Sequence, residues 1–330
     1  MGKTTFRDAI NRTLDEALDR DPSVFLFGED IGPLGGAFQV TKDLWKKYGT
    51  KRVRNTPISE AAIIGTAIGT ACTGLKPIAE IMFCDFLYIG MDQLVNQMSK
   101  MKYMYGGKAV LPIVLRTTYG AGLSAAAQHA QSNEAMFMHV PGLKLVMPST
   151  PYDARGLLVS SIEDENPVLF FEHHCLYDVA GEIPETDYTI PLGVADIKRS
   201  GEDLTIIATG FMVHKSLEAA EELSKEGISA EVVDPRTLNP LDVDTIIKSV
   251  QKTNNVLIVH EAPQTAGSGA EISALIMERA FDFLDMPVRR VCGKDTPIPF
   301  SPILERFVIP QVDDITTSAR SLLRGAGKDL

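Results

Sequence analysis

The sequence predicts an α/β fold of two stacked domains with mainly parallel sheets. Short apolar runs, typical of buried strands, alternate with longer segments of helical periodicity along the 330 residues. The alternation lapses over residues 175–202, which are rich in Pro, Gly and acidic side chains and are typical of a linker. A chain of this length also suits two domains of ordinary size. We therefore expect one domain over residues 1–190 and a second over residues 191–330.

The first domain is expected to begin with a strand–helix alternation that gives a parallel sheet. Each expected strand is a short apolar run, and the expected helices between them carry apolar residues at helical spacing. The expected strands are Val24–Gly28, Pro77–Ile81, Pro112–Arg116, Lys144–Val146 and Val168–Phe171. The expected helices are Thr4–Arg20, Ser59–Thr73, Phe86–Lys102 and Pro151–Ile162.

The second domain repeats this alternation more regularly. Its first helix is expected to end at Gly227, because glycine suits the left-handed position that closes many helices. The expected strands are residues 204–209, 228–234, 255–261 and 287–292. The expected helices are residues 213–227, 242–253 and 268–284.

Charge and composition exclude several classes of function. The net charge is −11, which argues against a surface for nucleic acid or anionic membranes. No uninterrupted apolar run reaches the roughly 18 residues of a membrane span, and the N-terminal segment lacks the apolar core of a signal peptide. The four cysteines are scattered, which predicts reduced thiols rather than a zinc site or disulfides. We expect a cytoplasmic enzyme.

The glycine-rich segment 28–38 is the first candidate for binding phosphate. It contains neither G-K-[ST] nor G-x-G-x-x-G. A metal–diphosphate motif needs an Asp flanked by Gly and an Asn further along the chain. Here Glu29 precedes Asp30 and Ile31 follows it, although Asn55 lies downstream. We interpret this segment as a flexible surface loop after a strand.

Glu60 is a sharper candidate. It opens a helix of small residues after a polar segment, with Ser59 as the expected N-cap. A carboxylate is favoured at that position by the helix dipole, so a purely structural role is one interpretation. Neighbours such as Ile58 and Ile63 should partly desolvate the carboxyl group. Because desolvation raises the pKa of a carboxyl group, acid–base chemistry is the other interpretation. From the residues alone the two stand equal.

His129 is the third candidate. It follows a stretch rich in Gly, Ala and Ser, where a ligand can approach the backbone, although a hydrogen-bonded structural role is the alternative. His173 and His174 end a strand, and we expect adjacent side chains there to point to opposite faces, which argues against a metal site. His260 and Glu261 end a strand of the second domain, where ligands often bind.

These motifs, in this order, resemble the β subunit of the E1 component of 2-oxo acid dehydrogenase complexes over nearly the whole chain. The matching segments are residues 28–44, 52–86, 91–107, 125–132, 139–158, 166–173, 234–242 and 293–305. The resemblance implies a pyrimidine-binding domain followed by a transketolase C-terminal-type domain. It also implies an oxidoreductase that decarboxylates pyruvate or cleaves acetoin and acylates the lipoyl group of E2.

The resemblance assigns roles to four residues. Glu60 matches the Glu that hydrogen-bonds N1′ of the thiamine diphosphate aminopyrimidine and shifts the ring toward the imino tautomer that deprotonates C2. Phe86 matches the aromatic residue that stacks on this ring, and Met82 lies nearby. His129 matches the His that orients the substrate and assists transfer to the lipoyl group. At position 130 this chain has Ala, where members of the family commonly have Ser. Residues 117–120 also differ from the Pro/Gly-rich sequence that the family commonly has at these positions.

The resemblance also implies metal ions and partners. Potassium would be held mainly by backbone carbonyls. The matching positions are Ile113, Ser161, Ile162, Asp164 and Asn166. The absent metal–diphosphate motif lies on a separate α subunit in this family, so thiamine diphosphate would be shared with α and Mg²⁺ held by α. The expected assembly is an α2β2 heterotetramer on a dihydrolipoyl acyltransferase E2 core, with the Met-rich segment 91–107 in a subunit interface.

Two alternatives remain at this point, and a third is excluded by length. A branched-chain 2-oxo acid dehydrogenase E1 β subunit would use the same motifs, although residues 170–185 look more like the acetoin and bacterial pyruvate branches. A non-catalytic partner subunit would keep the fold. A single-chain transketolase-like enzyme would need a diphosphate domain as well, which 330 residues cannot accommodate.

Overall fold

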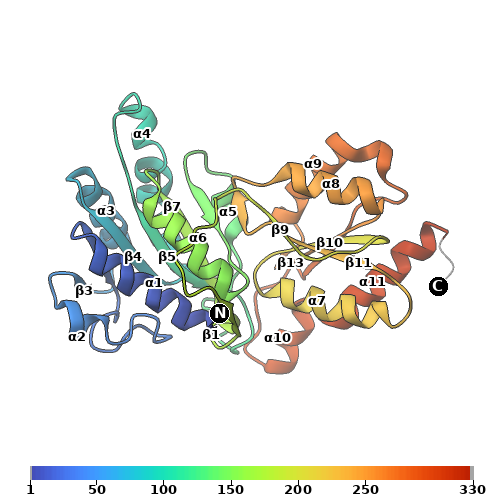
Figure 1. Cartoon of the computed structure of the whole chain (residues 1–330), viewed down its shortest axis with the longest axis horizontal. Helices are drawn as coiled ribbons and strands as arrows, with labels where there is room; N and C mark the ends of the chain where they lie inside the picture. Colours follow the sequence, from blue (N-terminus) through green and yellow to red (C-terminus); the bar gives the residue numbers. More distant parts are fainter. Residues whose placement is uncertain (1, 328–330) are drawn as a thin grey trace. The chain divides into compact units, whose positions relative to one another are not determined.

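The computed structural model describes residues 2–327, so residue 1 and residues 328–330, at the outer ends of the two expected domains, lie outside the description. The chain divides into two compact units (Figure 1). The first unit comprises Met1–Tyr119 and Met136–Leu192, and the second comprises Gly120–Ala135 and Gly193–Leu330. Each unit contains a mainly parallel sheet with helices, which confirms the predicted α/β class.

The sheet of the first unit has the strand order β6-β7-β5-β4-β2-β3, with all these neighbours parallel. Every residue of β5 and β7 is buried, as expected for central strands that are covered on both faces. The strands are β2 (Val24–Gly28), β3 (Val53–Asn55), β4 (Lys76–Phe83), β5 (Val114–Tyr119), β6 (Lys144–Val146) and β7 (Val168–His173). All five expected strands are present, and β3 was not expected.

Helices α1 and α6 of the first unit pack side by side (Figure 1). Both begin with a threonine cap, because Thr5 accepts a hydrogen bond from Asp8 N and Thr150 accepts one from Asp153 N. The helices of this part of the chain are α1 (Phe6–Arg20), α2 (Leu44–Tyr48), α3 (Glu60–Cys72), α4 (Met101–Met104), α5 (Glu134–Met138) and α6 (Pro151–Glu163). A small antiparallel pair joins β1 (Gly2–Thr5) to β8 (Ala180–Ile183).

The single helix expected over Phe86–Lys102 is wrong. The chain forms a 3₁₀ segment over Cys84–Gly90, a π-helical segment over Asp92–Met98 and then the short α4. Glycine permits this segment to pack closely on α3, because a Cβ at Gly90 would lie 2.3 Å from the Cδ1 atom of Ile64.

The sheet of the second unit has the order β14-β13-β10-β11-β9, with only the edge strand β9 antiparallel. Its strands are β9 (Asp196–Arg199), β10 (Leu204–Ala208), β11 (Ala230–Asp234), β13 (Val256–Pro263) and β14 (Arg289–Gly293). A short β12 (Thr237–Asn239) follows β11. The helices are α7 (Phe211–Ser224), α8 (Val243–Thr253), α9 (Ser268–Ala280), α10 (Pro302–Val308) and α11 (Val312–Gly325).

The structure adds elements that the sequence pattern did not predict. The expected linker over residues 175–202 contains β8 and β9, and the last 35 residues, for which no element was expected, contain α10 and α11. Apolar residues of α11 pack into the same core as α7 and β10, so this helix is part of the second unit's main core.

Candidate functional site

The carboxyl ends of the first unit's parallel strands carry the first group of candidate residues. Strand β2 ends just before Glu29, β3 ends five residues before Glu60, and β4 ends three residues before Phe86. Because parallel strands end at the same edge of a sheet, these residues lie at one edge, where α/β sheets commonly bind ligands.

Glu60 is the first residue of α3 and its side chain is buried, with the residue only 5% exposed. Ser59 occupies the N-cap position, but its side chain makes no capping hydrogen bond. Among residues 2–327, no group donates a hydrogen bond to the Glu60 carboxylate. A buried carboxylate at a helix start, with no donor from the described chain, is suited to accept a hydrogen bond from a ligand.

Glu29 is a second buried carboxyl group at this edge, and the sequence interpretation missed it. It is 7% exposed, and its Oε1 atom is buried without a hydrogen bond. Burial raises the pKa of Glu29, and the negative charge of Glu60 raises it further, followed by those of Asp30 and Glu80. The nearby charge of Glu60 therefore makes the ionised form of Glu29 less favourable.

The interpretation of residues 28–38 as a surface loop holds for only part of the segment, because Leu34 is exposed whereas several neighbouring residues are buried. Ile31 is buried, and its carbonyl accepts a hydrogen bond of 2.8 Å from the Thr41 hydroxyl group. The Asn55 side chain, considered above as a metal ligand, accepts a hydrogen bond of 2.6 Å from Gly32 N. These bonds tie the segment that contains Glu29 to Asn55 at the end of β3 and to Thr41.

Met82 and Phe86 lie at the end of β4 and in the 3₁₀ segment that follows, and both are half-buried. The Phe86 ring packs edge-on against Phe83, with ring centroids 6.4 Å apart. The carbonyl oxygen of Met82 accepts a hydrogen bond from the Thr118 hydroxyl group on β5. The structure thus places Met82 at the end of β4 and Phe86 just beyond it, with Phe86 partly accessible for stacking.

A buried ionic network lies within the sheet next to these residues. The guanidinium group of Arg116 on β5 donates two hydrogen bonds to Glu172 on β7, at 2.7 and 2.8 Å, and one of 2.7 Å to Glu80 on β4. The Tyr177 hydroxyl group also donates to Glu172, at 2.8 Å. Burial raises the pKa of Glu80, although the charge of Arg116 opposes this shift. The network joins three neighbouring strands.

His129 belongs to the second unit and is exposed, on the segment 120–135. In the sequence, His129 lies between two residues of this segment that bind Glu261. The backbone N–H of Ala121 donates to Glu261 Oε1 at 2.5 Å, and the Ser132 hydroxyl group donates to the same atom at 3.3 Å. Glu60, Met82 and Phe86 lie together in the first unit, whereas His129 lies in the second.

His260 packs closely in the interior of the second unit. It is buried, and its Nε2 atom lies 3.2 Å from the Cys292 Sγ atom. Burial lowers the pKa of His260 to about 4, so the ring is neutral near pH 7. A Cβ at Gly269 in α9 would lie 2.7 Å from the Nε2 atom, so the glycine permits close packing of α9 on the imidazole. Glu261, its neighbour, instead binds the loop that carries His129.

His173 and His174 do not point to opposite faces, so that expectation is wrong. Strand β7 ends at His173 and a 3₁₀ turn begins at His174, which ends the alternation of side chains. The ring centroids lie 5.1 Å apart. A ligand atom from each of these two residues and one from Cys175 lie within 4.8 Å of one another.

Four of the five potassium positions lie at or just after the C-terminal end of α6. The fifth, Ile113, directly precedes β5, and its carbonyl accepts a hydrogen bond of 2.9 Å from Val168 N. The Asp164 carboxylate accepts hydrogen bonds from the Lys144 ammonium group and from the backbone and side chain of Asn166. Burial opposes ionisation, but these hydrogen bonds prevail and the pKa of Asp164 lies below its usual value. The Asp164 side chain is therefore already engaged. Carbonyls in the last turn of a helix lack intrahelical partners, so Ser161 and Ile162 suit a cation through their backbone oxygens.

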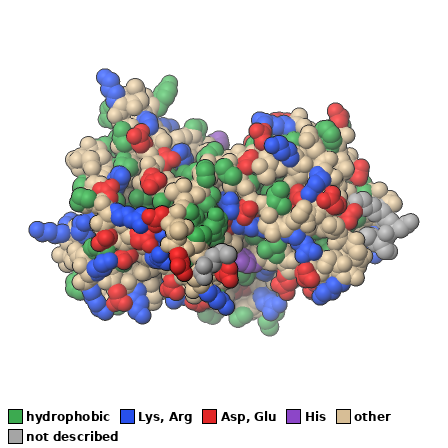
Figure 2. Space-filling model, in the orientation of Figure 1, with side chains coloured by type: hydrophobic (Ala, Val, Ile, Leu, Met, Phe, Trp, Pro, Cys, Tyr) green, Lys and Arg blue, Asp and Glu red, His purple; other side chains and the backbone are tan. Residues whose placement is uncertain are grey.

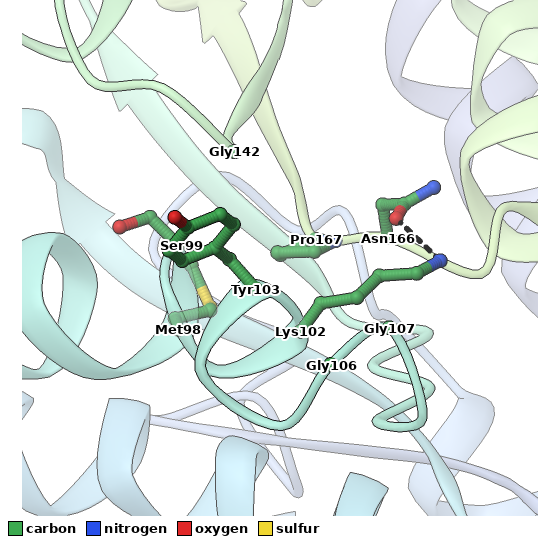
Figure 3. A pocket seen from close by; sticks show the side chains of 9 residues that line it. All are labelled: Met98, Ser99, Lys102, Tyr103, Gly106, Gly107, Gly142, Asn166 and Pro167. Atoms are coloured by element: carbon green, nitrogen blue, oxygen red, sulfur yellow. Dashed lines mark hydrogen bonds between the residues drawn. The ribbon is translucent and has the colours of Figure 1, made fainter.

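A cavity of about 440 Å³ adjoins this region (Figure 3). The Lys102 side chain forms part of the wall of this cavity and donates a hydrogen bond of 2.9 Å to the Asn166 side chain. The lining residues are Met98, Ser99, Lys102, Tyr103, Gly106, Gly107, Gly142, Asn166 and Pro167. None of the candidate residues at the carboxyl edge of the sheet lines this cavity, so it is separate from Glu60.

Comparison with known proteins gives matches along most of the chain. Residues 2–179 match the family model of the transketolase pyrimidine binding domain, and residues 193–315 match that of the transketolase C-terminal domain. Among solved structures, a split gene transketolase described as an inactive β4 tetramer has a TM-score of 0.80 at 23% identity, over 98% of this chain and 99% of that chain. This likeness confirms the fold.

The curated relatives are more similar in sequence. The chain is 49% identical to the β subunit of acetoin:2,6-dichlorophenolindophenol oxidoreductase from Bacillus subtilis (strain 168), over 96% of each chain. Its identity to two other B. subtilis proteins is 47% for the pyruvate dehydrogenase E1 component subunit beta and 44% for the 2-oxoisovalerate dehydrogenase subunit beta. Each of these two comparisons covers 98% of this chain and 99% of the relative. No helix within residues 2–327 is long and apolar enough to cross a membrane. Because these relatives are 44–49% identical over nearly the whole chain, the chain belongs to the family of E1 β subunits of the acetoin, pyruvate and 2-oxoisovalerate dehydrogenases.

Proposed function

We propose that this chain is the β subunit of a thiamine-diphosphate-dependent E1 enzyme that acts on acetoin or pyruvate and is active only with an α subunit. The observation that carries the proposal is the buried Glu60 carboxylate, which begins α3 and receives no hydrogen bond from any residue in 2–327. Near-full-length relatives of the acetoin and pyruvate enzymes support the same function.

The residues of this chain would bind the aminopyrimidine of the coenzyme. Thiamine diphosphate supplies a carbon nucleophile at C2 when it is bound. Glu60 would hold a proton against the N1′ atom, and burial strengthens that hydrogen bond because little water competes for it. Phe86 would stack on the ring, and Met82 would contact its edge. His129 would orient the substrate and assist acyl transfer to the lipoyl group of E2.

The metal ions would be divided between the subunits. No G-D-G type diphosphate motif occurs in the sequence, so Mg²⁺ would be held by α. Potassium would bind through the carbonyls of Ile113, Ser161, Ile162, Asp164 and Asn166, while the Asp164 side chain stays paired with Lys144.

The proposed α2β2 heterotetramer and its docking on an E2 core are supported by exposed apolar side chains. Hydrophobic side chains reach the surface over α4 and over α10 (Figure 2). They are Tyr103, Met104 and Tyr105 near α4, and Phe300, Ile303, Leu304 and Phe307 near α10. Patches of this kind commonly mark protein interfaces. All four cysteines are free, which is consistent with the proposed cytoplasmic location.

Two further parts of the proposal concern domains and substrate. Residues 1–190 would form the pyrimidine-binding domain and residues 191–330 the transketolase C-terminal-like domain. A branched-chain E1 β subunit is the alternative, which the 44% identity to the 2-oxoisovalerate dehydrogenase subunit beta favours. Activity with α present on acetoin, pyruvate and 2-oxoisovalerate would distinguish these substrates, and a non-catalytic partner subunit would support turnover of none.

The isolated chain is expected to show no 2-oxo acid-dependent dye reduction, because it lacks the Mg²⁺–diphosphate half-site. Adding a cognate α subunit should produce turnover and raise the affinity for thiamine diphosphate. Steady-state dye reduction and calorimetric titration of the coenzyme measure the two effects, with α alone as the control. Turnover by the isolated chain equal to that of the mixture would contradict the proposal.

His129→Ala is expected to slow reductive acylation of the lipoyl domain by about 10²-fold or more, on the scale of general acid–base catalysis. Heterotetramer assembly and coenzyme binding should be unchanged, because the side chain is exposed in this chain. Single-turnover acylation of a purified lipoyl domain measures the effect. His214→Ala, which removes an imidazole from α7 of the same unit, is the control. A wild-type rate of acylation in His129→Ala would return His129 to a structural role.

A further inference from the structure

The loop that carries His129 adopts a strained backbone conformation. Ser124 and Ala126 have φ angles of 55° and 63°, in the left-handed region that side chains other than glycine rarely adopt. Gly120 and Gly122 also have positive φ angles, of 98° and 120°. Such a conformation persists only where surrounding contacts determine it.

Glu305 on α10 supplies several of these contacts. It is 3% exposed, and its carboxylate accepts hydrogen bonds from Gly122 N at 2.8 Å and from Ser124 N at 3.0 and 3.2 Å. The Ser124 hydroxyl group also donates to it, at 3.3 Å. One buried carboxylate therefore binds the backbone N–H groups of two residues with positive φ angles, Gly122 and Ser124. Hydrogen bonds to a charged acceptor are stronger than those between neutral groups.

Glu261 holds the two ends of the same loop. Its Oε1 atom accepts hydrogen bonds from Ala121 N and from the Ser132 hydroxyl group, so residues eleven apart in the sequence share one oxygen. The loop also closes on itself through a 3.0 Å hydrogen bond from Gly120 N to the Gln131 carbonyl. Between these points Ala121 and Ala130 are buried in a small apolar cluster with Val308 and Ile309.

We propose that Glu305 and Glu261 are positioning residues that fix the 120–132 loop and so present His129 for acyl transfer. The two carboxylates and the apolar cluster leave the exposed imidazole on a rigid support rather than on a mobile segment. Rigid support matters because a small displacement of a catalytic group can lower a rate by orders of magnitude. The catalytic consequence rests on the proposed function, whereas the fixation of the loop does not.

The direct test is hydrogen exchange of the peptide spanning residues 120–132 in the purified full chain, measured by mass spectrometry. Glu305→Gln keeps the size of the side chain but removes the charge that binds Gly122 and Ser124. Backbone exchange in the loop should accelerate by about tenfold or more, the equivalent of one lost charged hydrogen bond. Glu261→Gln should have the same effect and serves as the second variant if Glu305→Gln does not fold.

Glu231→Gln is the matched control. Glu231 is likewise a buried carboxylate of the second unit, but its partners are Ser249, Gly201 and Lys252, outside the loop. Its replacement should lower thermal stability without accelerating exchange in residues 120–132. Unchanged loop exchange in both Glu305→Gln and Glu261→Gln, or equal acceleration in Glu231→Gln, would overturn the fixation.

The consequence for His129 is tested in the reconstituted enzyme. Glu305→Gln should lower the rate of lipoyl acylation by about tenfold or more, while proton exchange at coenzyme C2 stays at the wild-type rate, because Glu60 lies in the other unit. A merely structural defect would lower both rates together. Acylation at the wild-type rate despite an opened loop would overturn the positioning role. Failure of the wild-type mixture to turn over any substrate would refute the proposed function and leave the exchange result standing.

Discussion

Glu60→Gln is expected to slow hydrogen–deuterium exchange at C2 of bound thiamine diphosphate by about 10²–10⁴-fold in the reconstituted α/β enzyme. Glutamine keeps the size of the side chain and can hydrogen-bond N1′, but it cannot exchange a proton with it. The site is buried, so water cannot readily replace the carboxyl group. Assembly should change little, because a Glu to Gln change at a helix start alters stability by about 1 kcal/mol or less.

The measurement is quenched-flow exchange followed by NMR of the extracted coenzyme. Glu134→Gln is the matched control, because Glu134 is also buried and also begins a helix, where its carboxylate accepts a hydrogen bond of 3.3 Å from Ser268. C2 exchange as fast in Glu60→Gln as in wild type would leave Glu60 with only its role at the helix dipole.

Arg116→Met is expected to lower the free energy of unfolding by about 3–5 kcal/mol, the usual effect of removing one partner from a buried ionic network. The change leaves Glu80 and Glu172 in the sheet without the guanidinium group that donates three hydrogen bonds to them. Urea unfolding followed by circular dichroism measures the loss. Arg199→Met removes the cation from a more exposed pair with Glu221 and should cost about 1 kcal/mol or less.

The destabilisation by Arg116→Met should depend on pH. Burial already raises the pKa of Glu80, and Arg116 is the group that opposes this shift. A carboxyl group whose pKa is higher in the folded state than in the unfolded state favours folding when it is protonated. The loss should therefore be largest at neutral and alkaline pH and should shrink as the pH falls through the raised pKa. A loss independent of pH would show that the lost packing of the arginine stem dominates.

Local sequence patterns were sufficient to predict most of the sheet strands and the helix that Glu60 begins. Apolar runs such as Val24–Gly28 identify buried strands directly, because both faces of these strands are covered. The helix expected over Phe86–Lys102 failed because apolar periodicity does not distinguish α, 3₁₀ and π winding, and the chain uses all three there. The strand pair β1–β8 was missed because its two short strands are separated by most of the first unit's sequence.

The candidate site shows the same division. Glu60 could be proposed from its position at a helix start with apolar neighbours, which is local information. Glu29 could not, because its burial depends on a loop whose hydrogen bonds involve Asn55 and Thr41. Glu305 could not either, because its partner Gly122 lies 183 positions away in the sequence. No local pattern reports a contact of that separation.

The assignment of residues 120–135 to the second unit has a practical consequence for dissecting this protein. A gene cut at codon 190 would produce an N-terminal fragment that includes the His129 loop but lacks both carboxylates that bind it. The C-terminal fragment would then carry Glu261 and Glu305 buried in place, with no backbone N–H groups from Ala121, Gly122 and Ser124 to satisfy them. Neither fragment would reproduce the structure that its residues have in the intact chain. Fragments intended for complementation would need to be co-expressed, so that the loop can recover its partners as the two pieces fold.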